Sequence, residues 1–229
     1  MPSFNIEDIL YEDEDIIVCR KRAGIAVQSA RSSQLDMESA LRNYLSKGDV
    51  QKAIPYIGII QRLDQPVEGV IVFAKNPMAA KVLNQQMQQN QIEKIYMAVV
   101  KGPIAKNEGK LEDFLLKDGR TNTSKVVTKG TKGSKQAILF YDVLESKEDK
   151  HILKINLQTG RHHQIRVQLA NAGMPIVGDR KYNPEDTSAK QLALCAHTIK
   201  FKHPRTRKEM TFEIKPQNEE FLECQEITS

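Results

Sequence analysis

Strand-forming segments recur along most of this 229-residue chain, and they constrain the fold more than any other feature of the sequence. They are runs rich in β-branched and aromatic residues that end at turn-forming residues. Because many of them are adjacent in sequence, we expect an α+β fold built on a mixed, largely antiparallel sheet with flanking helices. The expected strands lie within residues 15–24, 69–75, 93–102, 110–117, 135–146, 151–158, 192–201 and 208–215.

A helical pattern is found in three places. Residues 37–45 carry apolar side chains at the spacing of an amphipathic helix, and Gly48 is expected to end it. Asn76 and Pro77 supply an N-cap and a first-turn proline for a helix that continues to about residue 89. A third helix is expected within residues 160–175, ended by Gly173 and Pro175, with these residues on its buried side: Ile165, Leu169 and Ala172.

The composition is ordinary for a globular protein, with 40% hydrophobic and 28% charged residues. The three cysteines, Cys19, Cys195 and Cys224, are scattered and form no C-x-x-C pair, which argues against a disulfide framework and a zinc knuckle. No signal-peptide pattern opens the chain, and no apolar run approaches the ~20 residues of a membrane span. We therefore expect a cytoplasmic protein with no membrane partner.

Charge is distributed unevenly along the chain. The first 15 residues hold six acids and neither Lys nor Arg, so the remainder has 34 basic against 23 acidic residues, a formal charge of +11. Basic residues cluster in residues 124–135 and 200–208, and such patches attract phosphate backbones. Nucleic acid is therefore the leading partner, and the alternative is a solvated face with a mobile loop. The first cluster consists of Lys125, Lys129, Lys132 and Lys135.

Two opposite charges, Arg62 and Asp64, lie in one of the most apolar stretches, "IIQRLDQPVEGVIVF". A carboxylate shielded from solvent there needs a cation nearby, because burial without one would neutralise it. An ion pair with Arg62, or a turn-forming role before Pro66, is one interpretation. The other is that an arginine from "LQTGRHHQIR", which contains Arg161 and Arg166, holds Asp64 ionised.

Several catalytic motifs are missing from the sequence: it has no G-x-G-x-x-G before a helix, no P-loop and no G-x-S-x-G. His162, His163, His197 and Cys195 suggest a metal site only weakly. Adjacent histidines on a helix are expected to point about 100° apart, and one strand face offers at most two ligands. We therefore expect packing and hydrogen-bonding roles for these side chains, and no metal.

Four ordered blocks closely resemble the RluA-type pseudouridine synthase family. They are "QRLDQPVEGVIVFAK", "EKIYMAVVKG", "LQTGRHHQIRVQLANAGMPIVGDRKY" and "LALCAHTIKFKHP", and the resemblance covers roughly residues 10–216. It implies an enzyme that isomerises uridine to pseudouridine in ribosomal or transfer RNA, without cofactor or metal. It also implies a pseudouridine synthase-like fold in which a central catalytic cleft crosses the sheet.

The same resemblance implies roles for individual residues. Asp64 matches the catalytic aspartate, as nucleophile or charge stabiliser at C1′ of the uridine. Tyr96 matches a tyrosine that stacks on the base, and Arg166 an arginine that pairs with the aspartate. Arg62 matches a residue that fills the gap left by the flipped-out nucleotide. The other residues expected to bind RNA are Arg161, Lys125, Lys129, Lys132 and Lys135.

The first block departs from the family pattern H-R-L-D-x-x-T-S-G at Gln61, Val67 and Glu68, and Gln168 replaces a common histidine. A catalytically silent RNA-binding protein is therefore one alternative. A glycoside-type hydrolase that uses Glu68 as a second carboxylate is another. We expect one catalytic domain over residues 1–229, beginning with the acidic segment 1–15 and lacking a separate S4-like domain, and acting as a monomer.

Overall fold

The computed structural model describes residues 4–29, 36–47 and 53–225. The chain forms two compact units. Unit 1 consists of Met1–Glu93 with Ala196–Lys215, and unit 2 of Lys94–Cys195 with Pro216–Ser229. The expectation of one catalytic domain stays a prediction.

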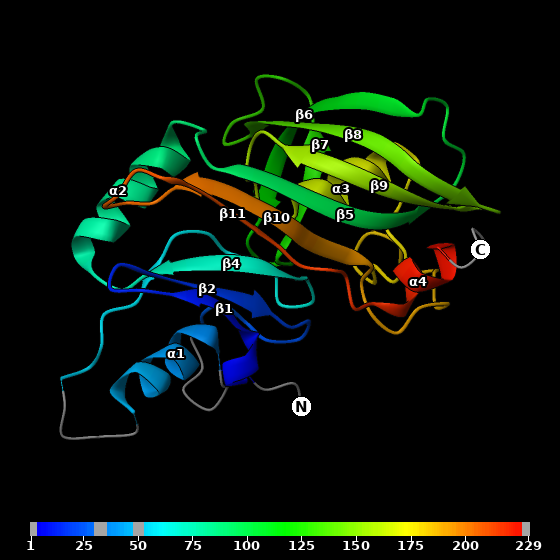
Figure 1. Ribbon diagram of the computed structural model, residues 1–229. Coiled ribbons are helices and arrows are strands. Elements are labelled where there is room, and N and C mark those ends of the chain that lie inside the picture. The colour runs from blue at the N-terminus through cyan, green and yellow to red at the C-terminus, as the bar shows by residue number, and fades with distance from the viewer. Residues whose placement is uncertain (1–3, 30–35, 48–52, 226–229) are drawn as a thin grey trace. The chain divides into compact units, whose positions relative to one another are not determined.

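In unit 1 the strand order is β1, β2, β4 and β10, with β11 beside β10 and β3 beside β4 (Figure 1). β1 pairs with β2, β2 and β3 pair with β4, and β10 pairs with β11, all antiparallel. The strands are β1 (Ile9–Glu12), β2 (Ile16–Lys21), β3 (Gly58–Ile59), β4 (Glu68–Ala74), β10 (Leu194–Lys202) and β11 (Glu209–Glu213). The helices are η1 (Ile6–Asp8), α1 (Met37–Ser46) and α2 (Pro77–Gln88).

The centre of unit 1 is the pair β2 and β4. Every residue of β4 is buried, and Ile16 to Cys19 of β2 have no exposed surface, as expected for apolar, β-branched strands enclosed on both faces. Asn76 caps α2 by accepting a hydrogen bond from the Ala79 N–H, which confirms the predicted start of that helix. α1 ends at Ser46, and its C-cap residue Lys47 has a φ of 53°. Gly48, which was expected to stop it, lies outside the described residues.

In unit 2 five strands form an antiparallel series in the order β5, β9, β8, β6, β7. They are β5 (Glu93–Lys101), β6 (Glu108–Asp118), β7 (Thr123–Val127), β8 (Lys135–Lys147) and β9 (Lys150–Leu157); the helices are α3 (Gln164–Asn171) and α4 (Glu219–Gln225). Tyr96, Ile155 and Tyr141 lie opposite one another across β5, β9 and β8 and are all buried. Val167 of α3 packs on the same face, against Leu115 and Ala137.

The expected α+β class, its strands and its three helices are confirmed, and most differences are local. β7, which the sequence suggested was part of a loop, pairs with β6 from Phe114↔Val127 to Asp118↔Thr123. β1, β3 and α4 were not expected. For α3, Ile165 and Leu169 are buried as predicted, but Ala172 is exposed, and the polar residues within 164–169 are buried as well. Residues 164–169 can all be buried because the polar side chains among them find partners in the interior. In the described part of the chain, no helix is long and apolar enough to cross a bilayer.

Candidate active site

Asp64 lies on the connection between β3 and β4 in unit 1. The chain turns there, with the Val67 N–H donating to the Asp64 carbonyl at 3.0 Å. The Gly24 N–H donates to the Gln65 carbonyl at 2.8 Å, and the Gln65 side chain donates back to the Gly24 carbonyl, so the turn is fixed to the loop after β2. Asp64 itself is partly exposed, as a turn position allows. The expected shielding of its carboxylate from solvent stays a prediction.

Lys21 at the end of β2 supplies a buried cation beside this turn. Its side chain has no exposed surface, and its Nζ donates to the carbonyls of Gln65 at 3.0 Å and Ile25 at 2.7 Å, and of Arg22 at 3.2 Å. Burial lowers the pKa of Lys21 to about 7, whereas the charges of Asp64 and Glu68 raise it. Sequence reasoning missed Lys21; the available signal was a lysine ending an otherwise apolar strand.

Gly69 allows β4 to approach β10 closely. Its φ is 157°, and a Cβ placed there would lie 2.3 Å from Cβ of Ala196. A side chain at this position is therefore excluded by contact distance. Packing therefore explains why a glycine occupies position 69: it allows β4, the strand that follows the Asp64 turn, to lie close to β10.

In unit 2 the residues between β9 and α3 form a turn held by one side chain. Gln164 Oε1 accepts from the Thr159 hydroxyl at 2.7 Å and from the Arg161 N–H at 3.0 Å, while its Nε2 donates to the Ile138 carbonyl. Arg161 is exposed, and its Nε donates to the Gln136 carbonyl at 2.8 Å. This turn fixes the start of α3 and so the direction of Arg166.

Arg166 is buried, and its guanidinium grips Asp179 with two nitrogens. Nε lies 2.8 Å from Oδ2, and Nη2 lies 2.6 Å from Oδ1. The side chains are 5% and 1% exposed, so the pair is desolvated and geometrically fixed. The pairing of Arg166 with Asp64 would join the two units and stays a prediction. Sequence reasoning missed Asp179, although it belongs to the quoted segment "GMPIVGDRKY".

Tyr96 is 9% exposed and points to the face of the sheet on which α3 packs. Lys94, two residues earlier on the same face of β5, has its Nζ 3.9 Å from the position of a Cβ on Gly160. Burial lowers the pKa of Lys94. Unit 2 therefore places Tyr96 and the helix of Arg166 on one side of its sheet, while Arg62, which is exposed, and Asp64 belong to unit 1.

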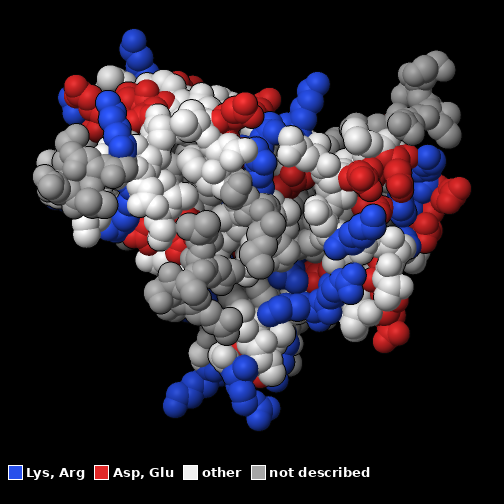
Figure 2. Space-filling model, turned by 90° about the horizontal axis from the view of Figure 1, so that it is seen from below, with Lys and Arg blue, Asp and Glu red and all other residues white. Residues whose placement is uncertain are grey.

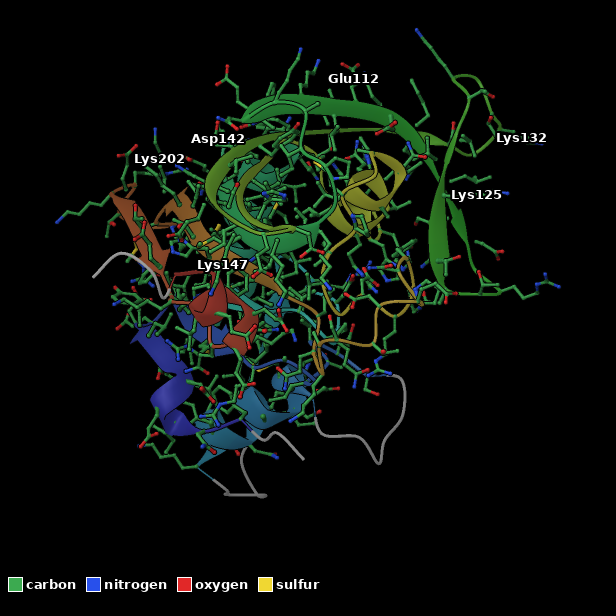
Figure 3. All side chains as sticks on the ribbon, turned by 90° about the vertical axis from the view of Figure 1, so that its right-hand side faces the viewer. Glu112, Lys125, Lys132, Asp142, Lys147 and Lys202 are labelled. Atoms are coloured by element: carbon green, nitrogen blue, oxygen red, sulfur yellow. The ribbon has the colours of Figure 1, made fainter. Side chains whose placement is uncertain are left out.

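The expected RNA-binding lysines lie on β7 and the turn that joins it to β8, residues 123–135, here called the lysine hairpin. All four are exposed, and Figure 3 shows Lys125 and Lys132 projecting outward from it. On the face displayed in Figure 2, basic side chains form several separate groups with acidic ones beside some of them. The hairpin is folded at its base, where Ser124 is buried and its hydroxyl donates to the His162 carbonyl at 2.9 Å.

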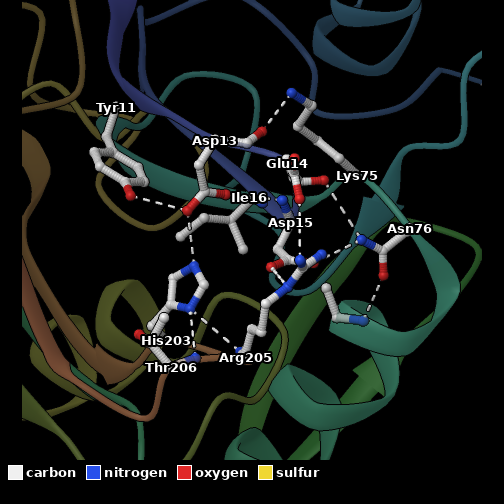
Figure 4. A network of polar contacts seen from close by, with 11 residues as sticks. Tyr11, Asp13, Glu14, Asp15, Ile16, Lys75, Asn76, His203, Arg205 and Thr206 are labelled. Atoms are coloured by element: carbon white, nitrogen blue, oxygen red, sulfur yellow. Dashed lines mark hydrogen bonds and ion pairs between the residues drawn. The ribbon is translucent and has the colours of Figure 1, made fainter.

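The acidic N-terminal segment pairs with the second basic cluster, within unit 1 (Figure 4). Arg205 Nε lies 2.6 Å from Asp15 Oδ2, and its Nη1 lies 3.0 Å from Glu14. His203 Nε2 lies 2.8 Å from Asp13, while its Nδ1 accepts two backbone N–H groups, so Nε2 carries the proton. Part of the charge at residues 200–208 is thus neutralised within the fold.

Asp13, Asp15 and His203 are also the one group of potential metal ligands in the described ranges. Their ligand atoms are already engaged with Arg205, Tyr11 and backbone N–H groups. The geometry expected for the adjacent histidines is wrong: His163 precedes α3 with a φ of 54°, and its ring stacks on that of His162 with centroids 3.8 Å apart. His162 Nδ1 lies 2.9 Å from the Ser124 hydroxyl and His163 Nδ1 lies 2.8 Å from the Tyr182 hydroxyl.

Comparison with known proteins gives a consistent result. The family model described as RNA pseudouridylate synthase matches residues 15–171. An uncharacterized RNA pseudouridine synthase, YlyB of Bacillus subtilis, is 33% identical over 208 residues, covering 90% of this chain and 68% of that protein. The tRNA pseudouridine synthase C of Haemophilus ducreyi is 31% identical over 228 residues, covering 89% of this chain and 88% of its own length.

Further relatives point the same way. Ribosomal large subunit pseudouridine synthase D of Neisseria meningitidis is 34% identical over 218 residues, covering 90% of this chain and 57% of that protein. The solved structure of human RNA pseudouridylate synthase domain containing 1 superimposes with a TM-score of 0.75 at 20% identity, covering 94% of this chain and 86% of that one, which shows a shared fold. The chain therefore belongs to the RluA-type family of RNA pseudouridine synthases.

Proposed function

We propose that this protein converts selected uridines of ribosomal or transfer RNA to pseudouridine, with Asp64 as the catalytic carboxylate. The observation that supports this most is that the family match over residues 15–171 includes Asp64, Tyr96 and Arg166. The bond from N1 of the base to C1′ breaks, the uracil turns within the site, and C5 bonds to C1′. C5 loses a proton and N1 gains one, so the reaction is an isomerisation.

The geometry within each unit supports a role for each residue. Asp64 is held on a fixed turn and is partly exposed, so a substrate can reach it. Lys21 Nζ donates to the Gln65 carbonyl and so helps to hold the turn that carries Asp64, whose carboxylate stabilises positive charge at C1′. Tyr96 stacks on the flipped base and assists proton transfer at C5, and Arg166 holds Asp64 ionised. Arg62, which is exposed, fills the gap in the RNA.

RNA binding in this proposal rests on sequence-independent contacts to phosphates. The lysine hairpin and Arg161 carry exposed positive charge, which suits the backbone of a folded RNA more than the edges of its bases. A monomeric, cytoplasmic enzyme completes the proposal. The cytoplasmic location is supported by Cys19, Cys195 and Cys224, which are buried and form no disulfide.

The test compares wild-type protein with Asp64→Asn and, as a matched control, Asp142→Asn, which changes an exposed aspartate of β8. Each is incubated with ribosomal and transfer RNA labelled at C5 of uridine with tritium. Wild type and Asp142→Asn should release tritium, whereas Asp64→Asn should release none and keep its RNA affinity within about twofold, because the substitution is nearly isosteric.

Each other outcome identifies a different function. RNA binding by the wild type without pseudouridine in any substrate would indicate the catalytically silent RNA-binding protein. Free uracil would indicate a hydrolase, with Glu68 as the second carboxylate. Full activity of Asp64→Asn would remove Asp64 from the mechanism.

A further inference from the structure

Arg166 is fixed by more than its bond to Asp179. Its guanidinium carbon lies 5.2 Å from the centre of the Tyr182 ring, within the range of a cation–π contact. One edge of the guanidinium therefore faces a carboxylate, while an aromatic ring lies near the group. Both partners come from the short segment that follows Gly178.

The segment that supplies these partners is held rigidly. Gly178 has a φ of 74°, and a Cβ there would lie 2.2 Å from the Gln191 carbonyl oxygen. Asp179 Oδ1 accepts from the Lys181 N–H at 3.0 Å and the Tyr182 N–H at 3.3 Å. The carboxylate that grips Arg166 therefore also organises the turn that places Tyr182.

Tyr182 is itself anchored to two other parts of unit 2. Its hydroxyl accepts a hydrogen bond from the Ser124 N–H at 2.8 Å and lies 2.8 Å from His163 Nδ1. The His163 ring meets the Tyr182 ring edge-on, with centroids 5.6 Å apart. The turn is thus tied to the base of the lysine hairpin and to the residue that precedes α3.

From this arrangement we propose that Asp179 is a positioning residue for catalysis, acting through Arg166, and that Tyr182 assists it. The inference rests on the proposed function, because it takes Arg166 as the arginine that acts on Asp64. Asp179 binds Nε and Nη2, which fixes the plane of the guanidinium and the direction of Nη1. Without Asp179 the arginine can rotate about its last bonds, and a misplacement of about 1 Å costs about 100-fold in rate.

A double-mutant cycle tests this inference. Wild type, Asp179→Asn, Arg166→Met and the double variant are compared in single-turnover pseudouridine formation with saturating enzyme, below the lowest melting temperature of the set. We expect Asp179→Asn to lower the rate by about 10- to 100-fold and to change the RNA dissociation constant by less than about twofold. In the Arg166→Met background the same change should cost less than about threefold, because the residue through which Asp179 acts is gone.

Tyr182 provides a second series that leaves the buried pair intact. Tyr182→Leu removes the ring, and Tyr182→Phe keeps the ring but removes the hydroxyl. We expect a rate loss of about tenfold for Tyr182→Leu and less than threefold for Tyr182→Phe, with both proteins folded because Tyr182 is only partly buried. This series decides the matter if Asp179→Asn does not fold.

Two results would overturn the inference while leaving the proposed function intact. One is a folded Asp179→Asn with the wild-type rate, and the other is an equal loss in both backgrounds of the cycle. An unaffected rate for Arg166→Met would remove Arg166 from the mechanism and Asp179 with it. A wild-type protein that forms no pseudouridine would instead contradict the proposed function itself.

Discussion

The Nζ atom of Lys21 lies 3.0 Å from the carbonyl oxygen of Gln65, the residue that follows Asp64. The two residues are distant in sequence but meet because β2 pairs with β4, which places Lys21 opposite Gly69, the residue after Glu68. A buried lysine is stable only if its ammonium group has hydrogen-bond acceptors or opposite charges nearby. Three backbone carbonyls and the fields of Asp64 and Glu68 supply both. Lys21 therefore holds the backbone of the Asp64 turn by a hydrogen bond, and its own pKa responds to the charge of Asp64.

Lys21 should make stability depend on pH in a particular direction. Its pKa is about 7 in the folded protein, below the value of about 10.4 in an unfolded chain. Between these values the unfolded state binds a proton that the folded state lacks, so the free energy of unfolding rises with pH. Urea unfolding should show wild type gaining up to about 2 kcal/mol from pH 7 to pH 9 relative to Lys21→Met.

The control for this measurement is Lys154→Met, which changes an exposed lysine of β9. That variant should follow the wild-type curve. If Lys21→Met and wild type gave parallel curves across this range, Lys21 would be protonated in both states and its pKa would not be lowered.

Gly69→Ala should destabilise the protein strongly. The added methyl would lie 2.3 Å from Cβ and 2.8 Å from Cα of Ala196, and backbone cannot yield as a flexible side chain would. A cost of about 3 kcal/mol in the free energy of unfolding is expected from overpacking. Gly119→Ala is the matched control, since its methyl would meet nothing within 4 Å. Equal stability of the two variants would show that β4 and β10 are not in close contact at this point.

Arg205→Gln should reveal how the acidic segment supports unit 1. The guanidinium of Arg205 holds the pKa of Asp15 below its usual value, against the opposing effect of burial. A lowered carboxyl pKa contributes stability above the unfolded value of about 3.9, and that contribution is lost as pH falls through the folded value. Thermal melting at pH 6 should therefore separate Arg205→Gln from wild type, and melting near pH 2 should not. Lys208→Gln, an exposed neighbour, should match wild type at both pH values.

The strands and helix starts could be predicted because their signals are local. β-branched runs specify β2 and β4, and Asn76 before Pro77 specifies the start of α2. The burial of the polar residues of α3 was not predicted, because a prediction from hydrophobic periodicity assumes that polar side chains face water. Gln168 has no exposed surface and donates to Asp113 at 2.7 Å, a partner 55 residues away that no local pattern identifies.

The candidate site was predictable only in part for the same reason. The resemblance pointed to Asp64, Tyr96 and Arg166 because they lie in recognisable blocks. Asp179 and Lys21 act through contacts that appear only after folding, the first with Arg166 and the second with a backbone carbonyl. Nothing in the sequence indicated β7 either: the lysine-rich stretch suggested a loop, although Ser124, the residue before Lys125, is buried and hydrogen-bonds with His162 and Tyr182.

The lysine hairpin should contribute to RNA affinity through charge alone. Replacing Lys125 and Lys132 by Glu removes two exposed cations that project outward and adds two repulsive charges. Each lost phosphate contact should reduce the slope of log K against log salt by about 0.7 to 0.9, so the double variant should bind more weakly and with a slope smaller by about 1.5. Filter binding at salt concentrations between about 50 and 200 mM measures both the affinity for RNA and the slope of log K against log salt. Lys154→Glu, which changes an exposed lysine on β9 outside the hairpin, should leave the slope unchanged. The rate of single-turnover pseudouridine formation at saturating protein should stay at the wild-type value, because the substituted lysines only contact the RNA backbone. An unchanged slope in the hairpin variant would place the RNA on another surface.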